Sequence, residues 1–482
     1  MLLKDLIAGL DAERVIGEDD VRVVDIDIDS KKVQKNHLFI CISGGSYDSH
    51  EAAGEAERYG ASAVVCERRL DVGITQIIVR DSRKAMSYLA AAFYSFPSEH
   101  MKIVGVTGTN GKTTTTHIIK EILERAGKKV GLIGTLGVFF GGTFYEPTLT
   151  TPDPLVLHKL LHEMYHYGID YVVMEVSAHA VELKKLEDVK FEVGVLTNLT
   201  QDHLDYFGTM DNYKAAKKRF LTSGRCRYVV VNSDDPLGRE ILAENPNAIS
   251  YGIENPADVF AINVKEDIEG TDYVLNLFDS VFNINTRLLG TFNVYNSLAA
   301  GVACSLLGVK VKDVSRALGE TGVVEGRLER VLVKNGVNVF VDYAHTPDGL
   351  ENSLKTLRKV TKNRLICVFG CGGNRDVSKR AVMGAVAGRL ADFTVITSDN
   401  PRFEEPMEII RDIESGLLKE SRNFVVIQSR VEAIRYAARY AAKGDVVLVA
   451  GKGCEKYQEI LGIKHLYNDK DCIEKIYRET GN

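Results

Sequence analysis

The chain lacks the features that mark membrane-spanning, secreted or disordered proteins. No apolar run approaches the 18 residues or more that a membrane span needs. Charged residues interrupt the first residues at Lys4 and Asp5, so we expect no secretory signal peptide. With only 10 prolines among 482 residues and a mean hydropathy of −0.07, long disordered or low-complexity tracts are not expected.

The charge balance excludes one class of partner. Lys and Arg number 60 and Asp and Glu 66, which gives a formal net charge of −6. A nucleic-acid binder that works through bulk positive charge is therefore excluded. The apolar fraction of 45% and charged fraction of 26% are ordinary for a globular protein, and the length suggests about three domains.

The cysteines indicate a reducing environment. The eight cysteines form no Cys-x-x-Cys pair and are scattered over the chain, several of them within apolar runs such as the one that ends at Cys66. Such residues are typical of small buried side chains in a cytoplasmic protein. We therefore expect a cytoplasmic location.

Apolar runs alternate with helical patterns, which predicts an α/β protein of three domains. Residues 1–98 predict a small α/β domain that ends in a linker. Residues 99–327 predict a mostly parallel sheet with helices on both faces, with a small antiparallel insert at 259–289. Residues 328–482 predict a doubly wound domain of five strands and four helices.

A glycine-rich turn follows the apolar run 102–106 and leads into the helical pattern 113–126. Backbone N–H groups at 108–113 can cradle phosphate oxygens, Lys112 can reach the terminal phosphates, and the Thr113 hydroxyl can contact Mg²⁺. A strict P-loop has glycine where this chain has Val106, so a tight turn that ends in a lysine is the alternative. The flanking strand and helix favour nucleotide binding.

Acidic and histidine side chains follow two other apolar runs. Glu175 ends the run that begins at Tyr171, and Asp202 and His203 follow the run 193–196. Strand carboxyl ends face the ligand crevice of a parallel sheet, so Glu175 is placed to bind Mg²⁺. An edge glutamate and a structural histidine are the alternatives. Lys217 lies in a helical pattern whose lysines, on pattern alone, predict a solvated basic face.

Several motifs in one order resemble the Mur ligases, ATP-dependent amide ligases of peptidoglycan precursor synthesis. The first are Thr-Gly-Thr-Asn-Gly-Lys-Thr at 107–113, Met-Glu-Val-Ser-x-His at 174–179, and Asn198 followed by Asp-His-Leu-Asp-Tyr at 202–206. Thr-Thr-Pro-Asp at 150–153 and Asp-Tyr-Ala-His-Thr-Pro-Asp at 342–348 resemble the branch that adds the third peptide residue. The resemblance covers nearly the whole chain.

The resemblance implies a UDP-binding domain, a central ATPase domain and a Rossmann-like domain for the incoming amino acid. It implies that ATP phosphorylates the D-glutamate carboxylate of UDP-MurNAc-L-Ala-D-Glu, and that an amine then attacks the acyl phosphate. Phosphorylation is needed because a carboxylate resists nucleophiles, whereas an acyl phosphate, a mixed anhydride, has phosphate as a leaving group. Mg²⁺ is the implied metal, and a monomer is expected.

The resemblance also implies roles for individual residues. Lys112, Glu175, His203 and Lys217 would be catalytic. Thr113, Glu175, His203 and Lys217, the last as an N6-carboxylysine (carbamate), would bind Mg²⁺. The ATP contacts would be Gly108, Thr109, Asn110, Gly111, Lys112, Thr113, Thr114, Asn293, Asn296, Arg327 and Asp342. The contacts to UDP-MurNAc-dipeptide would be Ser30, Asp48, His50, Thr150, Thr151, Ser177 and Lys185.

The third domain carries candidate binding residues after three of its expected strands: Arg375, Asp399, Asn400, Pro401, Arg402, Gly451 and Glu455. Two arginines and a glutamate suit an amino acid with an extra carboxylate, because guanidinium binds carboxylate bidentately and Glu455 can accept an ammonium. Lysine would leave Arg402 unpaired. The run 399–402 also resembles the signature of ligases that add meso-diaminopimelate.

Other functions stay open at this point. Within the fold, an L-lysine-adding ligase or a folylpolyglutamate synthase is an alternative. A P-loop regulatory ATPase that does not ligate belongs to another class. Gly370-x-Gly372-Gly373 suggests a nicotinamide oxidoreductase, but Arg375 occupies the third glycine position of that fingerprint.

Overall fold

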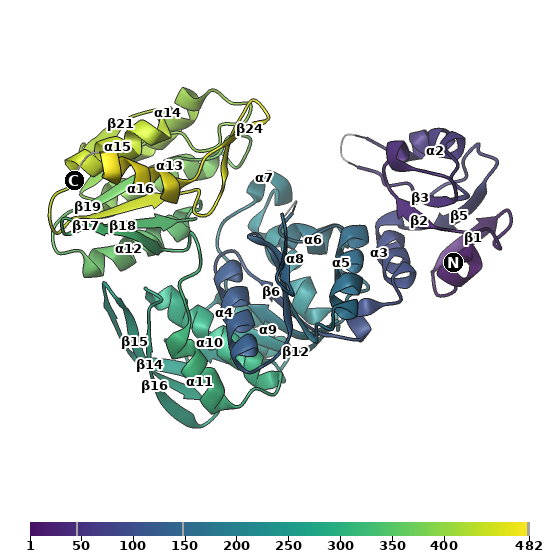
Figure 1. The fold of residues 1–482 in the computed structure, drawn as a ribbon, viewed down its shortest axis with the longest axis horizontal. Coiled ribbons are helices and arrows are strands. Elements are labelled where there is room, and N and C mark those ends of the chain that lie inside the picture. Colours follow the sequence, from purple (N-terminus) through teal and green to yellow (C-terminus); the bar gives the residue numbers. More distant parts are fainter. Residues whose placement is uncertain (45–46, 147–148, 480–482) are drawn as a thin grey trace. The chain divides into compact units, whose positions relative to one another are not determined.

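The computed structural model describes residues 1–44, 47–146 and 149–479 (Figure 1). The chain divides into two compact units. The first holds residues 1–107, 127–194 and 216–228, and the second holds 108–126, 195–215 and 229–482. The expected α/β class is confirmed, because helices alternate with strands of largely parallel sheets. The domain boundaries expected near 98 and 327 stay predictions.

The N-terminal part of the first unit is a five-stranded sheet with the strand order β1-β5-β4-β3-β2. Neighbouring strands are parallel except β1 and β5. Leu38 and Phe39 are successive residues that pack into different cores on the two faces, as strand periodicity requires. The elements are α1 Leu3–Leu6, β1 Ala12–Ile16, β2 Asp25–Asp27, β3 His37–Ile40, α2 Ala53–Tyr59, β4 Ala63–Cys66, β5 Thr75–Val79 and α3 Ser82–Phe93.

The middle of the chain forms a sheet with the order β16-β15-β14-β13-β12-β11-β6-β10-β7-β8-β9. In the first unit, β10 is parallel to both β6 and β7, and Glu175 pairs with Val106 at the carboxyl ends of β10 and β6. The elements are β6 Lys102–Thr107, α4 Lys112–Arg125, β7 Val130–Gly134, β8 Gly137–Phe140, β9 Thr143–Tyr145, α5 Pro154–His166, β10 Tyr171–Glu175, α6 Ala178–Glu182, β11 Phe191–Leu196, α7 Leu204–Phe207, α8 Met210–Thr222, β12 Cys226–Asn232, α9 Pro236–Glu244 and β13 Ile249–Gly252.

The antiparallel insert expected at 259–289 is present in the second unit. Strands β14 Val259–Asp267, β15 Gly270–Leu277 and β16 Ser280–Thr286 pair antiparallel in sequence order. Helices α10 Thr291–Leu306 and α11 Val311–Glu320 follow it. Helix α10 packs against α4, the helix that follows the phosphate loop.

The C-terminal part is doubly wound, with the strand order β17-β18-β22-β19-β20-β21. Alternate residues of β19 face opposite cores: Cys367 packs with α12, α13 and α14, and Ile366 packs with α15 and α16. The elements are β17 Glu329–Lys334, β18 Val337–Asp342, α12 Pro347–Val360, β19 Leu365–Phe369, α13 Ser378–Leu390, β20 Phe393–Ile396, α14 Pro406–Leu417, β21 Phe424–Val426, α15 Arg430–Tyr440, β22 Val446–Ala450, β23 Tyr457–Ile460, β24 Ile463–Leu466 and α16 Asp469–Glu479.

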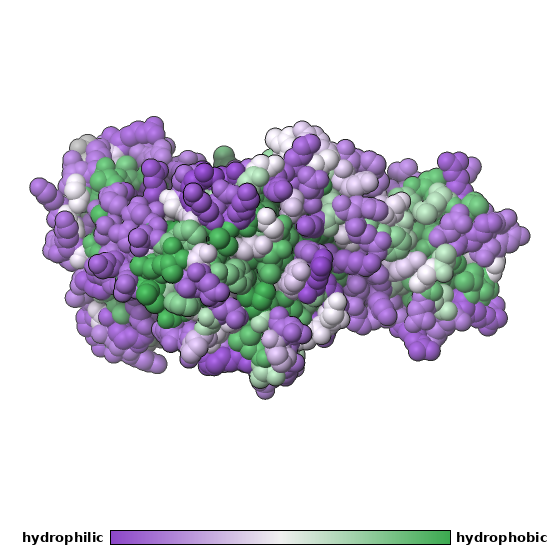
Figure 2. All heavy atoms as spheres, turned by 90° about the horizontal axis from the view of Figure 1, so that it is seen from below, coloured by the Kyte–Doolittle hydropathy of each residue, from purple (hydrophilic) through white to green (hydrophobic). Residues whose placement is uncertain are grey.

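The sequence prediction of five strands in this part was incomplete. Strand β17 is an added antiparallel edge strand, and β23 and β24 form a separate hairpin. Edge strands and hairpins bury little, so their sequences show no clear apolar run: β24 is exposed along its whole length. Among the described helices none is long and apolar enough to cross a bilayer, and Figure 2 shows polar residues interspersed with apolar ones over the face that it draws.

Candidate active site

The phosphate loop connects β6 to α4 in a conformation that its glycines permit. Gly108 has φ +150°, and a Cβ atom there would lie 1.8 Å from Oγ1 of Thr197. Gly111 has φ +86°, and its Cβ would lie 2.4 Å from Oδ1 of Asn296. A side chain at either position would therefore collide with its neighbours. Helix α4 begins at Lys112, so the N–H groups of its first turn point toward this loop.

The segment after β11 holds the phosphate loop in place. The Asn110 N–H donates to Oδ1 of Asn198 at 2.9 Å, and the Asn110 carbonyl accepts from Nδ2 of Asn198 at 3.1 Å and from Oγ1 of Thr197 at 2.6 Å. Oγ1 of Thr109 donates to the Thr200 carbonyl at 3.1 Å, and the Thr200 N–H donates to the same hydroxyl at 3.0 Å. These contacts fix the backbone that would meet phosphate.

Two cations lie at the loop. Nζ of Lys112 donates to the carbonyls of Gly108 at 2.8 Å and Thr109 at 2.9 Å, so the side chain curls back over its own loop. Nη2 of Arg327 donates to Oγ1 of Thr113 at 2.9 Å, and its guanidinium lies 4.4 Å from the ring centre of Tyr343. Arg327 is thus held beside the residue expected to contact both phosphate and Mg²⁺.

The remaining expected ATP contacts surround the start of α4 in the same unit. Oδ1 of Asn296 accepts from Oγ1 of Thr115 at 3.2 Å, and Nδ2 of Asn296 donates to Asn293 at 3.0 Å. Asp342 accepts a hydrogen bond from the N–H of Leu328, which is the residue after Arg327. Burial raises the pKa of Asp342, although the nearby Arg327 charge opposes that shift. Asp342 therefore positions the segment that carries Arg327.

Asp202 is the centre of a charged cluster. Its carboxylate is buried and lies 3.4 Å from Nε2 of His203, 3.9 Å from Nε2 of His345 and 3.9 Å from Nζ of Lys379. Burial alone would raise the pKa of Asp202, but the nearby His345, His203 and Lys379 outweigh it and leave the pKa at about 2.

In the first unit, the hydroxyl groups expected to contact the dipeptide lie in a hydrogen-bond network around Glu175. Its two carboxylate oxygens accept from the N–H and the hydroxyl of Thr135, at 2.8 and 3.1 Å. The Thr135 hydroxyl lies 3.2 Å from that of Thr150. Thr151 donates to the Glu175 carbonyl at 2.8 Å and accepts the Ser177 N–H at 3.0 Å. Glu175 is only 1% exposed, so it is no solvated edge glutamate.

Lys217 corrects one expectation from pattern alone. Its side chain is not on a solvated face, because Lys217 is 1% exposed. It lies on the same side of α8 as the buried Tyr213 and Phe220, at helical spacings of four and three residues. Lys185 is also buried, and its ammonium pairs with Asp153 at 2.7 Å.

The N-terminal residues expected to bind the UDP-sugar form a hydrogen-bonded cluster. Nε2 of His50 accepts the Glu67 N–H at 3.0 Å, so the proton is assigned to Nδ1, which donates to Asp48 at 2.5 Å. This bond holds the pKa of Asp48 below its usual range, and Arg68 contributes at 3.0 Å. Ser30 donates to Glu55 at 2.5 Å. Both His50 nitrogens are therefore occupied, and His50 orients Asp48.

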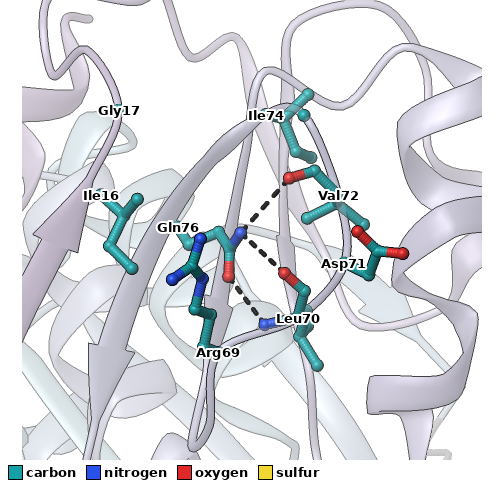
Figure 3. A pocket seen from close by; sticks show the side chains of 9 residues that line it. Ile16, Gly17, Arg69, Leu70, Asp71, Val72, Ile74 and Gln76 are labelled. Atoms are coloured by element: carbon teal, nitrogen blue, oxygen red, sulfur yellow. Dashed lines mark hydrogen bonds between the residues drawn. The ribbon is translucent and has the colours of Figure 1, made fainter.

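A pocket of about 430 Å³ in this N-terminal part is lined by none of these cluster residues. It is lined by Ile16, Gly17 and the segment 69–76, and contains none of the expected site residues (Figure 3). Gln76 at its base donates to the carbonyls of Leu70 and Val72 and accepts the Leu70 N–H. The side-chain amide of Gln76 therefore makes its hydrogen bonds within the 70–76 turn and stabilises it.

The carboxyl ends of β19, β20 and β22 bring the expected amino-acid site together. Strand β19 is parallel to both of the others, so the segments that follow them meet at one edge. Nη1 of Arg402 donates to the Gly373 carbonyl at 2.7 Å, and its Nε donates to Glu459 at 3.2 Å. A Cβ at Gly373 would lie 2.0 Å from the Pro401 carbonyl. Arg375 is exposed beside this contact.

Glu455 has a partner that the sequence did not indicate. The buried Lys452 donates to Oε2 of Glu455 at 2.7 Å and to Oδ1 of Asn400 at 2.8 Å, and Asn400 donates to Glu455 at 2.9 Å. Burial raises the pKa of Glu455, and the Lys452 charge opposes that shift. A Cβ at Gly451 would lie 2.7 Å from Oδ2 of Asp399. Lys452 lies between two residues that the motif already marked, Gly451 and Glu455.

The expected magnesium ligands are divided between the two units. Glu175 and Lys217 lie in the first unit, and Thr113 and His203 in the second. Within the described ranges, no three His, Cys, Asp or Glu side chains converge as a metal-binding group. Three of the four expected ligands fit the ion chemically, because hydroxyl, carboxylate and carbamate oxygens are the donors that Mg²⁺ prefers, whereas His203 offers a nitrogen.

Comparisons with known proteins agree with the motifs. Residues 106–304 match the family model described as the Mur ligase middle domain, and 326–453 match that of the Mur ligase, glutamate ligase domain. A relative from Syntrophomonas wolfei, named UDP-N-acetylmuramoyl-L-alanyl-D-glutamate--2,6-diaminopimelate ligase, is 44% identical over 485 residues, 99% of each chain. A Geobacillus thermodenitrificans relative of the same name is 44% identical and covers 91% of each chain.

Solved structures give the same result. One titled as a structure of a ligase with that name aligns with a TM-score of 0.72 at 29% identity, covering 100% of this chain and 99% of the other. A folylpolyglutamate synthase from Mycobacterium tuberculosis, at 16% identity and a TM-score of 0.64 over 76% of this chain and 92% of that one, shows the shared fold alone. Together, the matched domains and full-length relatives show that this chain belongs to the Mur ligase family.

Proposed function

We propose that this protein is an ATP-dependent ligase that joins meso-diaminopimelate to UDP-MurNAc-L-Ala-D-Glu. The full-length relatives that bear this activity in their names support the proposal. The observation that carries it lies in the second unit. The loop that holds the phosphate loop also contacts α13, the helix that starts three residues after Arg375, through Gln201 and Ser378 at 3.4 Å.

In the proposed reaction, a D-glutamate carboxylate oxygen attacks the γ-phosphorus of ATP. The bond from that phosphorus to the bridging oxygen breaks, and ADP leaves. The neutral amine nitrogen then attacks the acyl carbon, the carbon–oxygen bond to phosphate breaks, and inorganic phosphate leaves. The nitrogen loses one proton to solvent as the peptide bond forms. Lys112 and the N–H groups that start α4 would bind the phosphate charge, since they are fixed before the substrate arrives.

Thr113, Glu175, His203 and carbamylated Lys217 would hold Mg²⁺, which would neutralise phosphate charge. The experiment is Lys217→Ala with short carboxylic acids added back, and Lys218→Ala as the control on the same helix. We expect Lys217→Ala to lose most ADP formation and to regain part of it with the added acid. Full activity of Lys217→Ala without acid would end the carbamate proposal.

The amino-acid specificity would come from charge matching. Arg402 and Arg375 would bind carboxylates of the incoming amino acid, and Glu455 would accept an ammonium. Lys452 pairs with Glu455 and donates to Asn400, so it holds the Glu455 carboxylate in position. Lysine lacks the distal carboxylate, so it would not form the carboxylate contact that one of the two guanidinium groups offers.

The deciding experiment measures ADP formation by the purified protein with UDP-MurNAc-L-Ala-D-Glu and ATP. Three reactions are compared: with meso-diaminopimelate, with L-lysine, and with no amino acid. We expect sustained turnover only with diaminopimelate. Equal rates with lysine would end the specificity proposal, and sustained turnover without any amino acid would favour the regulatory ATPase instead.

We also propose that the protein works as a monomer in the cytoplasm. The eight free cysteines of the chain, six of them buried, support a reducing environment. Light scattering on the purified protein should give the mass of one chain, 53.3 kDa. A mass of two chains or more at assay concentrations would contradict this.

A further inference from the structure

Lys379 is a nearly buried lysine whose ammonium has no hydrogen bond to any described residue. It lies in the first turn of α13, and its side chain is 8% exposed. Its nearest charge partner is Oδ1 of Asp202, at 3.9 Å, which is beyond hydrogen-bond distance. A lysine ammonium carries three donors, and no described protein group accepts a hydrogen bond from this one. Such a group is expected to meet an anion when the protein works.

Neighbouring cations of the same lobe show that this state is unusual. Arg380, the next residue, is also buried, but it donates to Asp412 at 2.9 Å and to Glu404 at 2.8 Å. Lys452 is buried as well, and it donates two hydrogen bonds, at 2.7 and 2.8 Å. Each of these two cations therefore donates to a carboxylate, although Nε of Arg380 has no partner. Lys379 differs from both.

The surroundings of Lys379 indicate which anion it would meet. Asp202 is two residues from Thr200, which is hydrogen-bonded to Thr109 of the phosphate loop. On the other side, Nδ2 of Asn110 donates to Oδ2 of Asp348 at 2.7 Å, in the segment that carries His345. Lys379 thus stands beside two segments that are each bonded to the phosphate loop. A phosphoryl group handled by that loop is the anion that this position fits.

We propose that Lys379 is a catalytic residue whose ammonium binds the phosphoryl group as it moves from ATP to the substrate carboxylate. This inference rests on the proposed ligase reaction. The oxygen–phosphorus bond forms as the bridging bond to ADP breaks, and Lys379 bonds to the non-bridging oxygens without gaining or losing a proton. Before substrates bind, Asp202 holds the ammonium nearby, and the phosphoryl oxygens then supply the hydrogen bonds that Asp202 does not.

The placement of Lys379 would also connect the two substrates. Arg375 and Lys379 lie four residues apart on the segment that leads from β19 into α13. Binding of the amino acid at Arg375 would therefore order the segment that carries the phosphoryl-binding cation. The chemical step would then be fastest when all substrates are present.

The experiment compares Lys379→Met, Lys379→Gln and Lys379→Arg with the wild type. Lys355→Met is the matched control, because Lys355 is an exposed lysine of α12, paired only with Glu351 among the described residues. We expect kcat for ADP formation to fall about 10²–10³-fold in the Met and Gln variants, as for loss of one charge-stabilising donor. KM for ATP and for the amino acid should change less than threefold. The Arg variant should have a kcat at least tenfold higher than that of the Met and Gln variants.

A second measurement separates chemistry from folding. Borohydride reduction traps the acyl phosphate formed when the amino acid is omitted, and we expect the Met variant to yield much less of it while ADP affinity and melting temperature match the wild type. Wild-type-like trapping in Lys379→Met, or a raised KM with unchanged kcat, overturns the inference. If Lys379→Met does not fold, the Arg and Gln variants decide. A folded Lys379→Arg protein whose kcat is no higher than that of Lys379→Gln also overturns the inference. An inactive wild type would instead refute the proposed ligase function.

Discussion

Asn198 offers a sharp test of how the phosphate loop is held. Its side chain accepts the Asn110 N–H at 2.9 Å and donates to the Asn110 carbonyl at 3.1 Å. Asn198→Ala removes both bonds, but keeps the backbone bond from the Thr109 N–H to the residue-198 carbonyl at 2.9 Å. The loop would keep its path but lose the clamp on its central peptide.

The expected loss follows from these two bonds. A net hydrogen bond contributes about 0.5–1.5 kcal/mol, so the pair contributes about 1–3 kcal/mol to holding the loop in its binding conformation. If nucleotide binding must restore that conformation, ADP affinity falls by about 5- to 150-fold. Asn198→Asp should be at least as damaging, because it removes the donor and adds a negative charge beside the phosphates.

Isothermal titration of ADP measures the effect directly. The matched control is Asn363→Ala, which removes a hydrogen bond of 2.8 Å to Asp445 in the C-terminal lobe. The control should bind ADP as the wild type does. A folded Asn198→Ala protein that binds ADP within twofold of the wild type would refute the view that this side chain preorganises the loop.

Three further predictions concern single positions. Gly108→Ala should abolish ADP binding, because its Cβ would lie 1.8 Å from Thr197 Oγ1. Gly127→Ala is the control, since Gly127 has φ +75° and no atom within 4 Å of the added Cβ. This control should lose about 1–2 kcal/mol of stability and bind ADP as the wild type does. Burial lowers the pKa of His158 to about 4, and neither ring nitrogen has a partner. The unfolded chain binds that proton below about pH 6.5 and the folded chain only below about pH 4, so the wild type loses stability as the pH falls between them, by about 2 kcal/mol at pH 5. His158→Leu should therefore raise the melting temperature at pH 5 more than at pH 8, and an equal gain at both would contradict the assigned burial. Arg402→Lys should lower kcat/KM for diaminopimelate about 10- to 100-fold and change that for L-lysine less than threefold, and a parallel fall for both would exclude carboxylate recognition.

Much of the architecture was accessible from local patterns. Buried parallel strands have continuous apolar runs, so the cores of β6, β10, β19 and β22 could be located, and polar motifs that follow such runs must lie at carboxyl ends. Strand β17 and the hairpin β23–β24 were not predicted from the sequence, because edge and exposed strands bury too few side chains to show an apolar run. The roles of individual site residues stay predictions.

The sequence by itself predicted that the glycines, Lys112 and Thr113 lie in one turn, because a strand, a glycine-rich turn and a helix follow one another directly along the chain. Tertiary structure alone decided that Lys217 is buried, that Asn198 clamps the phosphate loop, and that Lys379 approaches Asp202 from 177 positions away. A helix pattern reports which residues share a face, but only packing decides whether that face meets solvent or core. Charges distant in sequence meet because two sheets place their loops together, and no local pattern carries that information.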